Sequence, residues 1–391
     1  MWGVMRKTLL VAAALLAAAI ASPGIAGNDA IRTDAIAAEI ANAAAPSDYI
    51  TARFARADVV LLGEDHAIQQ HLSFVAGLIP DLHAAGVRNL VVEFGAAEDQ
   101  AELDALITAP EYDEAAASRL MFHYNTMWSW KEYRQLYRAA WAFNRSLAPG
   151  APPFRIVNMS YVYNWRGYTG TATPRDLKRV FGRGAVDAFR AEMITREVLD
   201  RGEKALVLTG TLHAFTRFGL PRTQSDSDGF CLRTYNALGN RLLRDHGARI
   251  ANVMFHQSLP ARPGAAQAFV QPGGGAIEQL MRANGNRPVG FDLRGAAAGT
   301  ILESGYYALC DDALSLADLF DGYIFLAPFA TLNPATPDPA FLHHGNIAEA
   351  IAQFPDPDWN PRPRNLEEAQ AHILKMARDI EVRYAGLVPD D

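Results

Sequence analysis

The sequence lacks the motifs by which several classes of hydrolase and cofactor protein are recognised. It contains no Gly-x-Ser-x-Gly nucleophile elbow, no His-Glu-x-x-His helix, no Walker-type phosphate loop and no Cys-x-x-Cys-His haem attachment motif. Residues 273–275 are consecutive glycines, but no predicted strand precedes them. The sequence therefore gives no sign of an elbow-type serine nucleophile, a zincin site, a P-loop or a covalently attached haem.

Cysteine and clustered positive charge are also scarce. Cys231 and Cys310 are the only cysteines in 391 residues, which leaves two alternatives open: a disulfide in an oxidising compartment, or two free buried thiols. The formal net charge is −7, and acidic and basic residues are interspersed. A nucleic-acid partner is therefore not expected, because such proteins carry a clustered basic face.

The N-terminus resembles an export signal. Arg6 and Lys7 precede an apolar run at residues 8–20, and Ser-Pro-Gly-Ile-Ala follows at residues 22–26. These are the three regions of a secretory signal peptide. An uncleaved anchor is the alternative, but the run is shorter than the roughly 20 residues of a membrane helix. We expect a signal peptide at residues 1–26, no stable membrane anchor after cleavage, and a periplasmic or secreted protein.

The remaining chain alternates between predicted strands and helices. Short apolar segments at 58–62, 89–92, 154–157, 204–209, 249–255, 289–293 and 321–327 predict strands. Helical periodicity occurs at residues 69–85, 98–106, 129–144, 175–201 and 366–384. The prediction is an α/β fold with a largely parallel central sheet flanked by helices. We expect one domain over residues 27–391, with a surface loop or lid at residues 260–275 and an irregular region around residues 334–364.

A Gly-x-x-His tetrapeptide occurs twice, each time directly after a predicted buried strand. The first copy is Gly63-Glu-Asp-His66 and the second is Gly210-Thr-Leu-His213. A third strand runs into Glu93. Because the ligand site of an open α/β sheet lies beyond the carboxyl ends of its strands, we expect His66, His213, Glu64 and Glu93 to converge there.

These four residues are the predicted catalytic set, and two mechanisms are compatible with them. His66, Glu93 and His213 could ligate a divalent metal such as zinc or manganese, which would lower the pKa of a bound water. Alternatively, one histidine held by a glutamate deprotonates water, while the other histidine or a backbone N–H stabilises the oxyanion.

Other polar and aromatic residues are weaker candidates. Tyr161, His71 and His256 are the predicted substrate-binding residues, because each lies near a strand end or on the helix after the first motif. Asp65 is interpreted as a cap of that helix. The aromatic residues Trp128, Tyr133 and Trp141 are interpreted mainly as core.

The motifs resemble those of the superfamily that unites erythromycin esterases, ChaN-like haem-binding proteins and Tiki/TraB-type metalloproteases. Residues 63–66 with His71 are similar to the ChaN pattern, and the doubled Gly-x-x-His is similar to the Tiki pattern. Residues 127–132 and 318–322 look more like the erythromycin esterase branch. The resemblance implies site roles for Glu64, His66, Glu93 and His213. Erythromycin esterases space the first histidine one residue further from the glycine, so a macrolide substrate is not predicted.

The leading hypothesis is an exported hydrolase that acts on an ester or amide bond, with a small-molecule or peptide substrate. The alternative is a haem-binding or haem-uptake protein of the ChaN type, with His or Tyr axial ligands in an apolar pocket. A non-catalytic binding module on the same scaffold is a third reading. The sequence leaves the substrate and the oligomeric state open.

Overall fold

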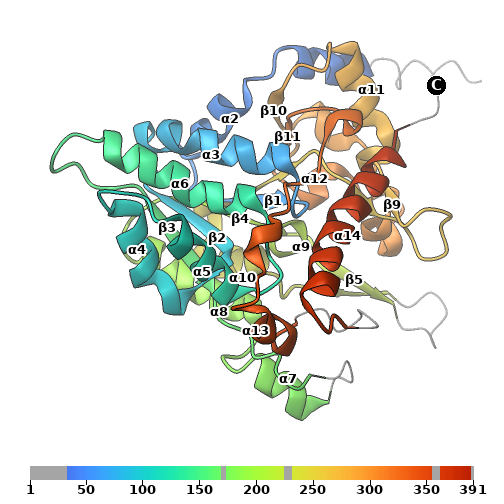
Figure 1. Ribbon diagram of the computed structural model, residues 1–391. Coiled ribbons are helices and arrows are strands. Elements are labelled where there is room, and N and C mark those ends of the chain that lie inside the picture. Colours follow the sequence, from blue (N-terminus) through green and yellow to red (C-terminus); the bar gives the residue numbers. More distant parts are fainter. Residues whose placement is uncertain (1–32, 169–172, 224–230, 355–361, 389–391) are drawn as a thin grey trace, which may run out of the picture.

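The computed structural model describes residues 33–168, 173–223, 231–354 and 362–388 (Figure 1). A seven-stranded sheet runs through the middle of the protein in the order β10-β11-β7-β1-β4-β2-β3. Neighbouring strands are parallel except β10, which pairs antiparallel with β11 at one edge. The strands are β1 (Val59–Glu64), β2 (Asn89–Ala96), β3 (Arg155–Ser160), β4 (Ala205–Gly210), β7 (Ile250–Phe255), β10 (Val289–Asp292) and β11 (Gly322–Phe325).

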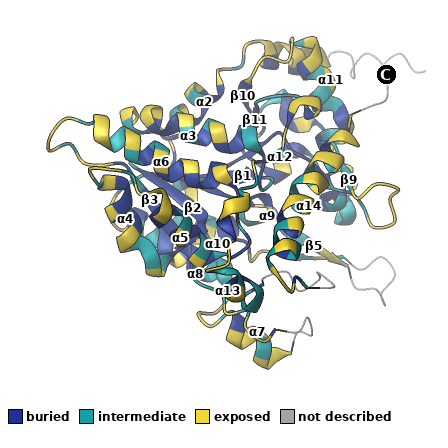
Figure 2. Cartoon of the chain, in the orientation of Figure 1, coloured by how far each residue is buried: buried dark blue, intermediate teal, exposed yellow. Residues whose placement is uncertain are grey.

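The period-two alternation of each strand divides the core into two layers. In β1, Val60 and Leu62 pack on one face of the sheet, and Val59 and Leu61 pack on the other. The same alternation continues in β2, β4 and β7. Because both faces are covered by helices, the strands are apolar throughout rather than apolar at every second position. Figure 2 shows this arrangement: the central strands are buried, and the helices that surround them are exposed on their outer sides.

Helices from the N-terminal and the C-terminal parts of the chain cover the face of the sheet on which Val60 and Leu62 lie. They are α2 (Pro46–Arg53), α3 (Gln69–Ala84), α4 (Gln100–Thr108), α5 (Glu114–Tyr124), α6 (Lys131–Ser146), α13 (Ile347–Ala352) and α14 (Leu366–Ala385). The second face is covered by α8 (Val186–Ile194), α9 (Thr211–Ala214), α10 (Leu238–His246), α11 (Ala276–Ala283) and α12 (Leu316–Leu319). The short helix α7 (Pro174–Val180) lies at the periphery (Figure 1).

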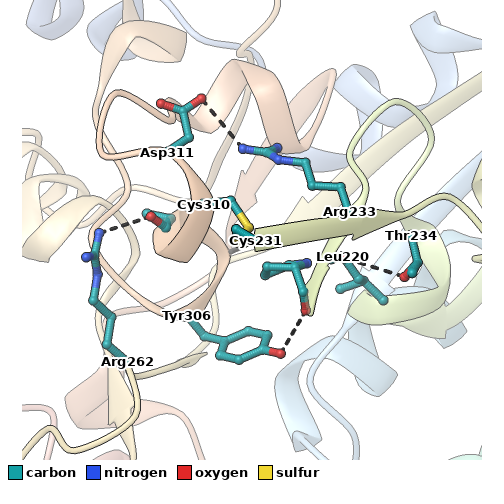
Figure 3. Close-up of a disulfide and its surroundings, with 10 residues drawn as sticks. Leu220, Cys231, Arg233, Thr234, Arg262, Tyr306, Cys310 and Asp311 are labelled. Carbon is teal, nitrogen blue, oxygen red and sulfur yellow. Dashed lines mark hydrogen bonds and ion pairs between the residues drawn. A yellow bond between two sulfur atoms is a disulfide. The ribbon is translucent and has the colours of Figure 1, made fainter. Parts of the chain in front are cut away.

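Two small antiparallel hairpins lie outside the main sheet. β5 (Leu220–Thr223) pairs with β6 (Cys231–Thr234), and β8 (Leu259–Pro260) pairs with β9 (Phe269–Val270). Cys231 on β6 forms a disulfide with Cys310 at the end of the 3₁₀ helix η6 (Tyr306–Cys310). Figure 3 shows that Arg233 pairs with Asp311 beside it, and that Tyr306 reaches the backbone of the β5 strand. The structure thus selects the disulfide from the two alternatives that the sequence left open.

The predicted α/β class, the parallel sheet and all seven of its strands are confirmed. The helices α5, α10 and α11 and both hairpins were not predicted. Residues 334–364 are less irregular than expected, since they include α13 and a 3₁₀ turn at Pro339–Phe341. The segment predicted as a loop or lid contains β9 and closes against β8.

One further prediction concerns the N-terminal part of the chain. The predicted signal peptide, residues 1–26, lies outside the described residues. Among the helices of the described ranges, none combines the length and the apolar character needed to cross a bilayer.

Candidate active site

The sheet register brings the two Gly-x-x-His turns side by side. β1 and β4 are neighbours, and Glu64 at the end of β1 lies opposite Gly210 at the end of β4. β2 is the other neighbour of β4, with Val92 opposite Leu208. Glu93 therefore lies across from Thr209, one strand away from Glu64. The predicted convergence of these strand ends is what the register produces.

Glu64 and His66 form the first imidazole–carboxylate pair. Glu64 is buried, and its Oε1 accepts hydrogen bonds from the Tyr133 hydroxyl at 2.6 Å and from His66 Nδ1 at 3.0 Å. Burial raises the pKa of Glu64. Burial alone would lower the pKa of His66, but the hydrogen bond to Glu64 and the charge of Glu93 outweigh it and raise that pKa to about 9. At neutral pH the His66 ring therefore carries a positive charge.

Glu93 is the centre of the site and points to the opposite face of the sheet from Glu64. Arg190 on α8 contacts Glu93 Oε1 at 3.0 Å, while Thr209 Oγ1 and the Gly210 N–H donate to Oε2 at 2.7 and 2.8 Å. Burial raises the pKa of Glu93, but the charge of Arg190, followed by His213 and His66, overcomes this and holds that pKa well below its usual range. Glu93 is thus a buried, permanently ionised carboxylate.

His213 and Asp187 form the second imidazole–carboxylate pair. His213 Nδ1 lies 2.8 Å from Asp187 Oδ1 and 2.9 Å from Oδ2, and His213 Nε2 lies 3.6 Å from Glu93 Oε1. Asp187 is in the first turn of α8, and its Oδ2 also accepts the N–H of Leu238 at the start of α10. A donor at Nδ1 fixes the tautomer, so the unshared electron pair of neutral His213 is on Nε2.

The glycines of the two tetrapeptides permit this close approach. A Cβ at Gly210 would lie 2.7 Å from His66 Nε2, so an alanine there would collide with the imidazole of the other motif. A Cβ at Gly63 would lie 3.3 Å from the Thr211 backbone and from Ala214. Each glycine therefore makes room for the turn that carries the opposite histidine.

Both histidines line one pocket of about 180 Å³. Its wall also includes Thr211, Gln257, Ser258, Phe269 and Tyr307. A larger cavity of about 720 Å³ lies near the amino ends of β7 and β11. Two of its carboxylates, Asp292 and Asp321, are already paired with arginines, and it contains no histidine, so the smaller pocket is the better candidate for an active site.

The three predicted substrate-binding residues do not line this pocket. His71 is buried under it, stacked on Phe255, and burial lowers its pKa to about 3. His256 is also in the core, between the Tyr323 hydroxyl at 2.6 Å and Glu278 at 2.8 Å. Tyr161 is buried and donates to the Gly184 carbonyl at 2.6 Å. His71 is on the buried face of α3, and His256 and Tyr161 follow strands that are covered by helices on both faces, so all three side chains lie in the core.

Asp65 also differs from its interpretation as a helix cap. The N-cap residue of α3 is Ile68. Asp65 Oδ2 instead contacts Ser258 Oγ at 3.0 Å, the Tyr384 hydroxyl at 2.7 Å and Arg383 at 2.9 Å. It therefore joins the His66 turn to the C-terminal helix α14, which lies close to β9 in Figure 1.

The predicted metal site of His66, Glu93 and His213 is not supported. Across the residues with a described position, no group of three or more His, Cys, Asp or Glu side chains is arranged to hold a metal ion. Both oxygens of the predicted ligand Glu93 already accept hydrogen bonds, Oε1 from Arg190 and Oε2 from the Gly210 N–H. The donor set is that of a hydrogen-bonded ion network rather than of a vacant coordination shell.

The sequence interpretation missed Asp187 and Arg190 and assigned Tyr133 mainly to the core. Asp187 and Arg190 are three residues apart, which places them on the same face of α8. The local sequence signal for Asp187 is its place in the first turn of a helix that follows the glycine break at residues 182–184. This signal does not indicate which histidine Asp187 contacts.

Comparison with known proteins agrees with the superfamily that the motifs suggested. Residues 50–179 match the family model described as haem-binding uptake, Tiki superfamily, ChaN. This segment contains His66 and Glu93 but ends before Asp187 and His213. No curated protein matches the chain.

Solved structures extend the comparison. A Bacillus cereus protein has a TM-score of 0.51 at 12% identity, covering 78% of this chain and 99% of its own, which shows a shared fold. A mutant of the erythromycin esterase EreC has a TM-score of 0.46 at 11% identity, with 71% and 92% covered. ChaN of Campylobacter jejuni, in a structure of cofacial haem binding, has a TM-score of 0.35 at 15% identity, with 56% and 88% covered. Over residues 50–179, the chain is therefore similar to the ChaN-like haem-binding uptake family of the Tiki superfamily.

Proposed function

We propose that the protein is an exported hydrolase that cleaves an ester or amide bond through two histidines in unequal environments. The observation that carries the proposal is that His66 and His213 line one pocket while each has its own carboxylate partner, Glu64 and Asp187. One carboxylate is fully buried and the other is partly exposed. Histidines in unequal environments can take the separate acid and base roles of one reaction.

His213 is the proposed general base. Its Nδ1–H donates to Asp187, which leaves Nε2 free to take a proton from water. Arg190 pairs with Glu93, whose Oε1 lies 3.6 Å from His213 Nε2. The charge of Glu93 favours the imidazolium that forms. This is the role that a carboxylate partner has in other histidine-dependent hydrolases.

His66 is the proposed electrophile and acid. Its positive charge at neutral pH, maintained by Glu64, stabilises the negative charge that develops on the carbonyl oxygen. The same ring can then give its proton to the leaving group. No metal enters these steps, because the donor set does not fit one.

Export is part of the same proposal. It is supported by the signal-like N-terminus and by the Cys231–Cys310 disulfide, since disulfides persist in oxidising compartments. Mass spectrometry of the protein recovered from the periplasm would test it, with a mature N-terminus after Ala26 as the expected result.

The test of the hydrolase proposal is the release of nitrophenol or nitroaniline from small esters and anilides. His213→Ala should lower kcat by about 10²–10⁴-fold, the usual contribution of general base catalysis. Asp187→Asn should lower it less, and His344→Ala, an exposed histidine outside the pocket, should leave it unchanged. Activity that survives in both His66→Ala and His213→Ala would refute the assignment.

Haem binding is the second candidate, because the matching family model describes haem-binding uptake proteins. The fit within the pocket is poor. A volume of about 180 Å³ is below the roughly 300–1,000 Å³ usual for drug-sized ligands. Titration with haemin decides between the candidates: a stoichiometric Soret shift that His66→Ala or His213→Ala abolishes would favour haem.

A further inference from the structure

The pocket contains two buried hydrogen-bond acceptors that the proposed mechanism does not use. Gln257 and Glu64 are 1% and 2% exposed, and both line the pocket. Within the described part of the chain, Gln257 Oε1 and Glu64 Oε2 accept no hydrogen bond. Buried polar atoms nearly always have partners, because an unsatisfied one loses its hydration without compensation. Two such atoms in one pocket indicate a ligand that supplies donors.

The orientation of the Gln257 amide follows from its neighbour. The Thr211 hydroxyl donates to the Glu64 carbonyl oxygen at 3.2 Å, so its proton is already used. The hydroxyl oxygen is then an acceptor, and it lies within hydrogen-bonding distance of the Gln257 amide nitrogen. Gln257 must therefore present its NH₂ group to Thr211 and its carbonyl oxygen elsewhere. A rotated amide would place two acceptors in contact.

One acceptor lies on the first histidine motif, and the other contacts a residue of the second. Glu64 precedes His66 by two residues, and Thr211, which orients Gln257, precedes His213 by two. Glu64 uses Oε1 for His66 and Tyr133, which leaves Oε2 for a ligand. A ligand that reaches these oxygens is held beside both imidazoles.

We propose that Gln257 Oε1, together with Glu64 Oε2, reads a hydrogen-bond donor on the substrate. The substrate class is then a carbonyl compound that carries an N–H or O–H group near the cleaved bond, such as a secondary amide or a hydroxy ester. Thr211 is a positioning residue, since it acts through the amide that it orients. The inference rests on the proposed function only in calling the ligand a substrate. The donor preference itself is a binding property and does not require turnover.

The experiment measures binding of matched probes by the imidazole C–H resonances of His66 and His213, assigned with the two alanine variants. N-methylacetamide is compared with N,N-dimethylacetamide, and 2-methoxyethanol with 1,2-dimethoxyethane. Each pair differs by one donor hydrogen replaced by a methyl group, and the extra methyl favours burial of the blocked member. The amide pair and the hydroxyl pair separate the two sources of donor.

Wild-type protein should bind at least one donor-bearing probe about 10-fold more tightly than its blocked partner, because the blocked partner leaves the buried acceptors unsatisfied. Gln257→Met should remove most of that preference, and Gln257→Glu, which retains an acceptor, should keep it. If Gln257→Met fails to fold, Thr211→Val tests the same point, since the freed amide can turn and the preference should fall.

Equal dissociation constants within both pairs, or no binding by any of the four probes, would overturn the inference, because the acceptors would then be satisfied by water. A donor preference in a protein that hydrolyses no ester or anilide would support the inference and refute the proposed function. Hydrolysis without donor preference would do the reverse.

Discussion

At the scale of single residues, the site depends on where a side chain is absent as much as on where one is present. Gly210 has backbone angles of φ −56° and ψ 143°, which any residue can adopt. The need for glycine is therefore steric, because a Cβ would approach His66 Nε2 to 2.7 Å. The second tetrapeptide thus positions the histidine of the first, a relationship that the doubled motif alone does not reveal.

Gly210→Ala should lower kcat by about 10-fold or more with a small change in stability, because misplaced catalytic groups lose orientation. Steady-state kinetics and thermal melting would measure the two effects. Gly77→Ala is the matched control, since a Cβ there meets nothing within 4 Å among the residues described. It should leave activity unchanged and raise stability by up to about 1 kcal/mol. An unchanged kcat in Gly210→Ala would contradict the close packing of the two motifs.

The raised pKa of His66 makes a second prediction at this scale. The folded-state pKa of His66 is about 9 and exceeds the ordinary 6.5. The contribution of its charge to folding stability is therefore fully present below about pH 6.5 and is lost as the pH rises through about 9. Activity should fall over the same alkaline range. Glu64→Gln removes the partner that raises this pKa, so the alkaline limb of the pH–rate profile should move to lower pH.

The control for this shift is Glu114→Gln. Glu114 is in an exposed pair with Arg138, far from the histidines in sequence and outside the pocket lining. Its substitution should not move the limb. A limb that stays near pH 9 in Glu64→Gln would mean that another group titrates there.

At the scale of secondary-structure elements, the end of the last helix supports two parts of the pocket wall from behind the lining residues. Arg383 and Tyr384 of α14 hold Asp65, the residue between Glu64 and His66. Arg383 also lies over the Phe269 ring at 4.7 Å, and Phe269 is part of the pocket wall. The C-terminal helix therefore fastens the first motif and the β8–β9 hairpin to each other.

Tyr384→Phe should destabilise the protein by about 1–3 kcal/mol, because Asp65 loses a buried donor and the Ser258 N–H loses its acceptor. It should also lower kcat, since the His66 turn is less firmly held. Urea denaturation and kinetics would measure both effects. Tyr235→Phe, at a tyrosine that is 53% exposed, should change neither. Full stability in Tyr384→Phe would show that the helix end does not support the turn.

At the scale of the whole molecule, the disulfide closes a long segment around the pocket. Cys231 and Cys310 are 79 residues apart, and the enclosed chain includes Gln257, Ser258 and Phe269 of the pocket wall. The helix η6, which ends in Cys310, also supplies Tyr307 to that wall. Cross-linking therefore constrains the part of the fold from which the substrate side of the pocket is built.

Replacing both cysteines by serine should lower the free energy of unfolding by about 4 kcal/mol, the chain-entropy effect of a loop of this length. Denaturation of wild type with and without reductant, compared with the double variant, would measure it. The reductant should have no effect on the double variant. If reduction leaves the wild-type midpoint unchanged, the cross-link contributes nothing to stability.

The sequence by itself determined the strands, the parallel class and the four residues Glu64, His66, Glu93 and His213. Apolar runs that end in glycine turns are local patterns, and parallel strands must present their ends at one edge. The contacts of these residues were decided by tertiary structure. Asp187, Tyr133 and Gln257 come from other elements, and nothing in their local sequence shows which histidine or carboxylate they meet. His71, His256 and Tyr161 were weaker candidates near the same strand ends, and the packing of the fold buries all three in the core.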